Sequence, residues 1–157
     1  MANIGDKIPA VNLKVMGAEG PSDLPLADFC ADKKVVMFAV PGAYTPTCSA
    51  AHLPGFVVHA DSLKAKGVDA IICTSVNDVF VMNAWGNAQN AEHIIMAADG
   101  NGELAKALDL ELNASGFGMG MRSKRYAMII DNGTISALNI DEAALEKSSA
   151  EAVLGLL

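Results

Sequence analysis

Six consecutive apolar residues at positions 35–40 restrict the fold of this chain more than any other feature, and they end at Pro41-Gly42. The run is too short for a typical helix and does not alternate with polar residues. It therefore predicts a strand that is buried on both faces. The chain has 157 residues, of which 52% are hydrophobic and 18% charged, which suits one domain over residues 1–157 with a sizeable core.

Short strands and helices alternate through the rest of the chain. We expect strands at residues 11–15, 35–40, 68–75, 94–96, 126–130 and 134–140, and helices at 47–66, 78–86, 103–108 and in the tail after 141. Residues 26–29 suit a short helix or a loop. The dipeptide Asn132-Gly133 predicts a tight turn between two antiparallel strands. This order predicts an α/β fold with a mixed central sheet flanked by helices, which is the thioredoxin-like pattern.

Several local signals refine these elements. Asn77 or Asp78 should cap the helix that follows, and Pro54-Gly55 should kink the helix at 47–66. The glycines at 116, 118 and 120 predict a flexible or tightly turned loop. In the tail, we expect five apolar side chains to pack inward: Ala144, Leu145, Ala152, Val153 and Leu156.

Composition and charge exclude several classes of function. The net charge of −7 disfavours nucleic acid and anionic lipid as partners. No apolar stretch approaches the length of a membrane span, and the first residues do not look like a secretory signal. The three cysteines do not form a disulfide framework, a CxxC pair or a zinc-binding pattern, so we expect no metal or cofactor. A reducing, cytoplasmic location is the simplest interpretation.

Cys48 is the strongest candidate for a reactive group. It follows the turn Tyr44-Thr45-Pro46-Thr47 and falls in the first turn of the predicted helix. Free backbone N–H groups and the positive end of the helix dipole both favour a thiolate there, which is the nucleophilic form. The alternative, that Cys48 is a small buried hydrophobe, is weak in this polar turn.

The other candidate residues have more ordinary interpretations. Cys73 lies inside an apolar strand and should be an inert core residue. Cys30 lies near the end of a short helix, where a half-exposed position is one alternative, and its burial and role are left undecided. His52 lies one helical turn after Cys48 and either tunes the thiol or is structural. His59 and His93 have no visible partners. Three large side chains are expected to be core or dimer contacts: Phe56, Met82 and Trp85.

The spacing Pro41-x-x-x-Thr45-x-x-Cys48 resembles the active-site signature of the peroxiredoxins. The strings at 41–49 and 52–56, with Ser75-Val76-Asn77-Asp78, Ala84-Trp85-Gly86 and residues 122–126, are similar to the peroxiredoxin 5 subfamily, which includes the plant type II enzymes. The resemblance extends from about residue 3 to the C-terminal helix. It implies a thioredoxin fold, commonly a homodimer, and a peroxidase that reduces hydrogen peroxide and small alkyl hydroperoxides.

The same resemblance assigns roles to four residues. Cys48 matches the peroxidatic cysteine, Thr45 its hydroxyl partner, Arg125 the active-site arginine, and Pro41 the proline that shields the pocket. An arginine cannot lose its proton, so Arg125 is able to hold a thiolate and to hydrogen-bond the peroxide. Without the motif, Thr45 reads as a turn or cap residue and Arg125 as a surface arginine.

One departure from the subfamily concerns regeneration. Some members carry a second, resolving cysteine near the C-terminus, but residues 145–150 contain none. This favours a one-cysteine cycle, in which glutathione with glutaredoxin, or thioredoxin, reduces a Cys48 sulfenic acid. Resolution by Cys30 or Cys73 remains open, as does a different function, a peroxide sensor that signals to a partner once Cys48 is oxidised. A non-catalytic binding module is a third possibility.

Overall fold

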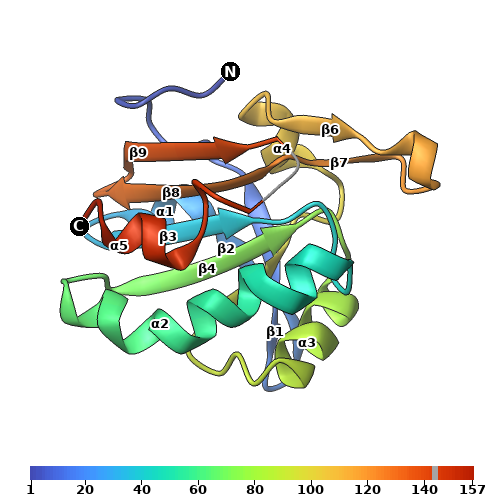
Figure 1. Cartoon of the computed structure of the whole chain (residues 1–157), viewed down its shortest axis with the longest axis horizontal. Coiled ribbons are helices and arrows are strands. Elements are labelled where there is room, and N and C mark those ends of the chain that lie inside the picture. The colour runs from blue at the N-terminus through green and yellow to red at the C-terminus, as the bar shows by residue number, and fades with distance from the viewer. Residues whose placement is uncertain (143–144) are drawn as a thin grey trace.

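The computed structural model describes residues 1–142 and 145–157, and its centre is one mixed sheet of seven strands (Figure 1). The strand order is β2-β1-β5-β4-β3-β8-β9. Strands β3, β4 and β5 are mutually parallel, β8 runs antiparallel to β3, and β1 runs antiparallel to β5. This arrangement confirms the predicted sheet. The bounds are β1 Asn12–Gly17, β2 Gly20–Pro25, β3 Lys34–Ala39, β4 Ala70–Ser75, β5 Ile95–Ala98, β8 Arg125–Asp131 and β9 Thr134–Asp141.

Helices cover both faces of the sheet and divide the core into two clusters. Helices α2 (Leu53–Ala65), α3 (Val79–Ala88) and α5 (Ala150–Leu154) pack on one face, and α1 (Leu26–Cys30) and α4 (Glu103–Ala107) on the other (Figure 1). Along β3, Val36 and Phe38 face the first group, whereas Val35 and Met37 face the second. The apolar run at 35–40 is therefore buried on both faces, as predicted.

One strand, β2, and one hairpin, β6–β7, were not predicted. Strand β2 lies at the sheet edge, where two prolines are tolerated because one side of the strand needs no ladder partner. The glycine-rich segment forms a hairpin of β6 (Glu111–Asn113) and β7 (Met121–Ser123) around a 3₁₀ turn, η2 (Ser115–Phe117). Neither β2 nor the β6–β7 hairpin shows the alternation of apolar and polar residues on which strand prediction depends. In Figure 1 this hairpin projects from the body of the molecule.

The predicted turn and cap are present. Asn132 and Gly133 have φ values of 49° and 79°, so both central residues of the β8–β9 turn are left-handed, as a two-residue hairpin of this type requires. Asp78 caps α3 by accepting a hydrogen bond from the backbone N–H of Val81 at 2.8 Å.

The sequence left the burial of Cys30 undecided, and the expected inward packing of Leu156 was wrong. Cys30 is fully buried rather than half-exposed, because α1 packs its C-terminal residue against the sheet. Leu156 is 52% exposed, because α5 ends at Leu154 and the chain leaves the helix before it. Val153 is buried as predicted, and Leu145 and Ala152 are partly buried. The expected inward packing of Ala144 lies outside the described residues.

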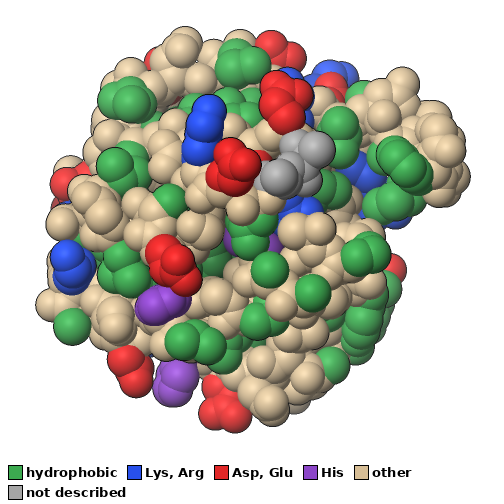
Figure 2. Space-filling view, viewed as in Figure 1, with side chains coloured by type: hydrophobic (Ala, Val, Ile, Leu, Met, Phe, Trp, Pro, Cys, Tyr) green, Lys and Arg blue, Asp and Glu red, His purple; other side chains and the backbone are tan. Residues whose placement is uncertain are grey.

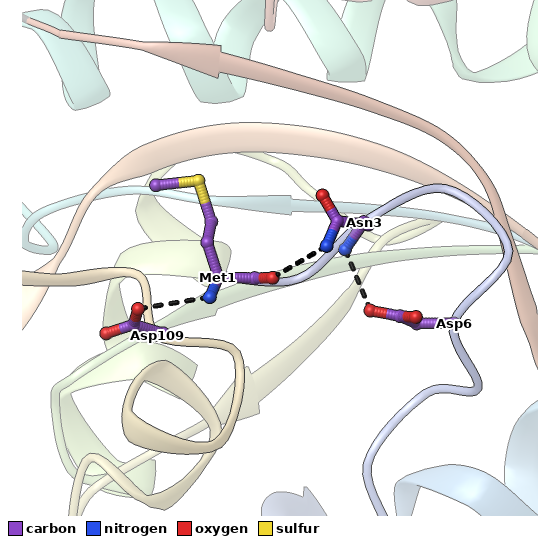
Figure 3. A network of polar contacts seen from close by, with 4 residues as sticks. All are labelled: Met1, Asn3, Asp6 and Asp109. Atoms are coloured by element: carbon purple, nitrogen blue, oxygen red, sulfur yellow. Dashed lines mark hydrogen bonds and ion pairs between the residues drawn. The ribbon is translucent and has the colours of Figure 1, made fainter.

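The N-terminal segment is tied to the connection between α4 and β6 (Figure 3). The terminal ammonium of Met1 pairs with Asp109 at 3.1 Å, and the backbone N–H of Ala2 donates to the carbonyl of Leu108 at 2.9 Å. Asn3 donates its side-chain amide to the Met1 carbonyl and its backbone N–H to Asp6. These contacts hold the segment against the side of the sheet away from α2.

Figure 2 shows acidic and basic side chains interspersed with hydrophobic ones on the face that carries α2 and α5. Among the helices described, none is long and apolar enough to cross a membrane.

Candidate active site

Cys48 begins a π-helical turn, η1 (Cys48–His52), that continues directly into α2. Pro46 and Thr47 are already helical, and the first intrahelical bond joins the N–H of Ser49 to the carbonyl of Thr45 at 2.9 Å. The N–H groups of Thr47 and Cys48 precede that bond, so Cys48 lies in the first helical turn, as predicted.

A π turn directly precedes Pro54, where the sequence predicts a kink. Pro54 has no N–H to donate, and in a regular α-helix its ring would press on the carbonyl four residues earlier. The wider turn moves the hydrogen-bond register so that the N–H of Leu53 bonds to the carbonyl of Cys48. Both ends of η1, Cys48 and His52, are buried.

The register of the sheet brings Arg125 to Cys48. Strands β3 and β8 pair with Ala39 opposite Tyr126, so Arg125 lies just beyond the last pair, where β3 ends and the loop to Cys48 begins. Alternate residues of β8, Ala127 and Ile129, face the α2 side of the sheet, and Arg125 shares their parity. The guanidinium is thus directed under the start of η1.

A buried guanidinium joins Cys48 to His52. Arg125 is 5% exposed and donates from Nη2 to Cys48 Sγ at 3.2 Å and from Nη1 to His52 Nδ1 at 2.8 Å. The contact between Arg125 and the sulfur that the sequence predicted is therefore present. Cys48 itself is 0% exposed, so the thiol is more enclosed than a helix mouth suggests.

His52 is held neutral by its surroundings. Burial, and then the positive charge of Arg125, lower the pKa of His52 from 6.5 to about 4, although the Ser148 carbonyl and Asp141 act in the opposite direction. Its Nε2 lies 2.9 Å from the Ser148 carbonyl, which only accepts, so Nε2 carries the proton. Nδ1 is then the acceptor for Arg125.

The charge of Arg125 is not balanced by a carboxylate in the described part of the chain. Within residues 1–142 and 145–157, no acidic side chain forms an ion pair with it. A buried cation is costly unless an anion or several hydrogen bonds compensate for it. The sulfur of Cys48, as thiolate, is the group in contact that is able to supply the negative charge.

Asn77 holds the loop between β3 and η1 in place, and Arg122 holds the neighbouring loop between β4 and α3. Asn77 Oδ1 accepts from the backbone N–H of Ala43 at 3.0 Å and from Ser75 Oγ at 2.7 Å. Arg122 donates from Nη1 to the Val76 carbonyl at 2.9 Å. Sequence reasoning assigned no such role to either residue, because each bond joins segments that meet only in the folded chain.

Thr45 and Pro41 lie on the same loop and are half-buried. The Thr45 hydroxyl donates to the Gly42 carbonyl at 2.7 Å, so its proton is engaged and its oxygen remains an acceptor. The expected contact between Thr45 and peroxide stays a prediction. Pro41 begins the loop directly after β3.

The buried Trp85 is tied to the same turn. Its indole N–H donates to Ser49 Oγ at 3.0 Å, and its ring lies among the core residues beneath η1. Met82 and Phe56 are also buried in this cluster, so all three side chains are core residues.

The remaining cysteines are buried at other positions, and the remaining histidines lie nearer the surface. Cys30 is on the opposite face of the sheet from Cys48, and burial raises its pKa to about 11. Cys73 shares the Cys48 side, but it is fully buried in β4, and desolvation, with a smaller effect of Cys48, raises its pKa well above its ordinary value. His93 is exposed, and His59 lies 3.6 Å from Glu151 at the surface. In the part of the chain that the structure covers, no group of His, Cys, Asp or Glu side chains suits a metal ion.

A buried cysteine in contact with a buried arginine on a thioredoxin-like sheet is typical of thiol-based redox proteins, and comparison with known proteins identifies the family. The Redoxin family pattern matches residues 3–154. The chain is 46% identical to peroxiredoxin-2E-2, chloroplastic, of Oryza sativa subsp. japonica, over 98% of this chain and 72% of that protein.

Two solved structures are similar over nearly the whole chain. Reduced Prx3 from Vibrio vulnificus in complex with H₂O₂ has a TM-score of 0.96 and 54% identity, covering 99% of both chains. Peroxiredoxin 5 from Alvinella pompejana has a TM-score of 0.85 and 34% identity, covering 98% of this chain and 96% of the other. The chain belongs to the Redoxin family, as a peroxiredoxin of the peroxiredoxin 5 and type II group. Its activity is thiol-dependent reduction of peroxides.

Proposed function

We propose that Cys48 is the peroxidatic cysteine and that it works in a one-cysteine cycle reset by an external thiol. The observation that carries this proposal is the 3.2 Å contact between Arg125 Nη2 and Cys48 Sγ. Arg125 is buried and forms no ion pair with a carboxylate among the residues that the structure describes. A permanent positive charge in that position favours the thiolate.

The reaction at Cys48 transfers one oxygen atom. The thiolate attacks one peroxide oxygen, the O–O bond breaks, and the sulfur becomes a sulfenic acid. The leaving oxygen takes up a proton and departs as water or an alcohol. Arg125 hydrogen-bonds the peroxide and stabilises the charge that develops on the leaving oxygen. Thr45, whose own proton is donated to Gly42, accepts from the peroxide O–H and orients it.

Pro41 shields the sulfur from bulk water. It follows β3 on the loop that leads to η1, and it has no N–H to compete for the thiolate. Because Cys48 has no exposed surface, a substrate reaches it only after side chains around this loop move. This favours hydrogen peroxide and small alkyl hydroperoxides over bulky ones.

The positions of the other cysteines support a one-cysteine cycle. Cys30 is separated from Cys48 by the sheet, and Cys73 lies in a central strand where its thiol stays protonated. Residues 145–150 contain no cysteine. The sulfenic acid then reacts with a first external thiol to give a mixed disulfide and water, and a second thiol releases the Cys48 thiolate.

Steady-state peroxide consumption tests the proposal. The native chain and Cys48→Ser are compared with glutathione and glutaredoxin, and with thioredoxin, as reductants. We expect many turnovers with at least one reductant and none for Cys48→Ser. After one equivalent of peroxide, intact mass should show one added oxygen or a glutathione adduct on Cys48. An internal Cys48–Cys73 disulfide as the main product would contradict the one-cysteine cycle.

The proposed assembly is a homodimer formed next to the active site. Four exposed hydrophobic side chains lie on segments around the catalytic loop: Tyr44, Phe80, Phe117 and Met121. The β6–β7 hairpin is close to this loop, since Met119 packs on Gly42 and Arg122 bonds to Val76. Phe117 is 86% exposed, which a second copy of the chain would cover.

Sedimentation of the native chain and of Phe117→Ser tests the assembly. A dimer that the substitution weakens is expected, and a monomer at all concentrations would contradict it. The Phe117 side chain makes little contact with its own chain, so the folded monomer should be unaffected. A cytoplasmic location remains a prediction.

A further inference from the structure

A buried chain of hydrogen bonds leads from Cys48 to the C-terminal segment. Arg125 contacts Cys48 with Nη2 and His52 with Nη1, and His52 continues from Nε2 to the Ser148 carbonyl at 2.9 Å. The carbonyl only accepts and the guanidinium only donates, so both nitrogens of the ring have a fixed role. One tautomer of a neutral His52 satisfies both contacts.

The Ser148 carbonyl is itself held in place by Asp141. The Asp141 carboxylate accepts from the backbone N–H groups of residues 146, 147 and 148, at 2.9 to 3.0 Å, and from the Ser148 hydroxyl at 2.6 Å. Burial alone would raise the pKa of Asp141, but these hydrogen bonds outweigh it and lower the pKa to about 2. The turn at 146–148 is thus fixed to the end of β9.

Asp141 is the cross-strand partner of Arg125, yet it does not pair with it. The two residues lie directly opposite one another in the β8–β9 ladder. The carboxylate is instead occupied by the 146–148 turn, and the guanidinium is left to His52 and Cys48. The acidic side chain therefore supports the imidazole rather than neutralising the arginine.

We propose that His52 is a positioning residue: seated on the Ser148 carbonyl, it holds one edge of the Arg125 guanidinium so that the other edge faces the Cys48 sulfur. This inference rests on the proposed roles of Cys48 and Arg125. Without the Nδ1 acceptor, Arg125 is free to rotate toward other acceptors, and the contact with sulfur and peroxide is lost for part of the time.

Two substitutions separate the two contacts of the ring. In His52→Asn, the amide oxygen falls near the former Nδ1 position and keeps an acceptor for Arg125. In His52→Gln, the amide nitrogen falls near the former Nε2 position and keeps the bond to Ser148 but not the acceptor. His59→Gln on the same helix is the matched control, because His59 lies at the surface beside Glu151.

The readouts are kcat/KM for hydrogen peroxide and the pH dependence of Cys48 alkylation, with thermal unfolding measured alongside. We expect His52→Gln to lose roughly tenfold or more in kcat/KM and to shift its alkylation midpoint to higher pH, because a hydrogen bond to a charged group is lost. His52→Asn should retain most of both, and His59→Gln should match the native chain. Equal losses in the Asn and Gln variants, or an unchanged alkylation profile in both, would overturn the proposal.

A measurement on the native chain covers the case in which the variants fail to fold. Nitrogen NMR of the histidine ring should show His52 as the neutral Nε2–H tautomer across pH 5 to 8. A protonated ring or the Nδ1–H tautomer would contradict the proposal. Failure of the proposed function gives a different result. If Cys48→Ser retains turnover, Cys48 is not the peroxidatic residue. If Cys48→Ser is inactive and His52→Gln is fully active, only the positioning role of His52 is refuted.

Discussion

Mild acid should destabilise the fold through His52. The pKa of this residue is about 4 in the folded chain, against an ordinary value of 6.5. Between these two pH values the unfolded chain binds a proton that the folded chain does not, so stability is lost as pH falls through this window. This pKa difference corresponds to about 3 kcal/mol of folding stability, at 1.36 kcal/mol for each pKa unit. About 2 kcal/mol of this stability should be lost by pH 5.

Urea unfolding at several pH values between 7 and 4.5 measures this loss, and His52→Asn isolates it. The variant lacks the titrating group but keeps the acceptor for Arg125. Other groups titrate in both proteins: burial raises the pKa of Asp99, and the hydrogen bonds around Asp141 confine its effect to lower pH. The difference between the two proteins therefore reports on His52. Parallel pH dependences for the native chain and the variant would refute the reasoning.

Three further substitutions test the site. Arg125→Lys should lower kcat/KM for peroxide by about tenfold or more, because one ammonium cannot reproduce the fork that bonds both Cys48 and His52; near-native kcat/KM would contradict this. Asn77→Ala should lower the free energy of unfolding in urea by about 1 to 3 kcal/mol and also lower kcat/KM, because the N–H of Ala43 loses its acceptor. An unchanged unfolding midpoint would show that this hydrogen bond does not stabilise the loop. Cys73→Ser should leave turnover with an external thiol intact, provided that the chain folds, and loss of turnover in a folded variant would assign Cys73 to the cycle.

The elements that sequence predicts well are those with a local physical cause. The apolar run at 35–40, the Asn132-Gly133 turn and the Asp78 cap each follow from neighbouring residues and are all present. Strand β2 and the β6–β7 hairpin also pair with neighbouring segments, but β2 contains two prolines and the connection between β6 and β7 is rich in glycine, so neither shows a strand pattern. The burial of Cys30 was left undecided because it depends on how α1 packs on the sheet.

The same distinction between local and long-range causes applies to the active site. Cys48 is identified by its place in a motif and at a helix start, whereas its contact with Arg125 requires the antiparallel register of β3 and β8. The role of His52 was left undecided because the deciding contact, the Ser148 carbonyl, lies 96 residues away and is a backbone atom. Every residue has a backbone carbonyl, so the residue type at position 148 does not indicate this hydrogen bond.

Two effects favour the proposed thiolate at Cys48. A helix N-terminus stabilises a nearby negative charge by about 0.3 to 1 kcal/mol when exposed, and up to about 2 kcal/mol when partly buried. Breaking a buried ion pair by removing one partner costs about 3 to 5 kcal/mol, because the remaining charge is left uncompensated. Since Cys48 and Arg125 are both buried and in contact, we expect the arginine to be the larger of the two contributions.

A double-mutant cycle with Cys48→Ser and Arg125→Met measures that contribution through urea unfolding at pH 8. If the pair is a thiolate and a guanidinium, the coupling between the two substitutions should be about 3 kcal/mol, since each single substitution leaves an unpaired buried group and the double variant does not. If the thiol is protonated, the coupling should fall to about 1 kcal/mol, the value for a neutral hydrogen bond. The smaller value would leave the helix terminus as the main source of any thiolate and would remove the electrostatic basis assigned to Arg125.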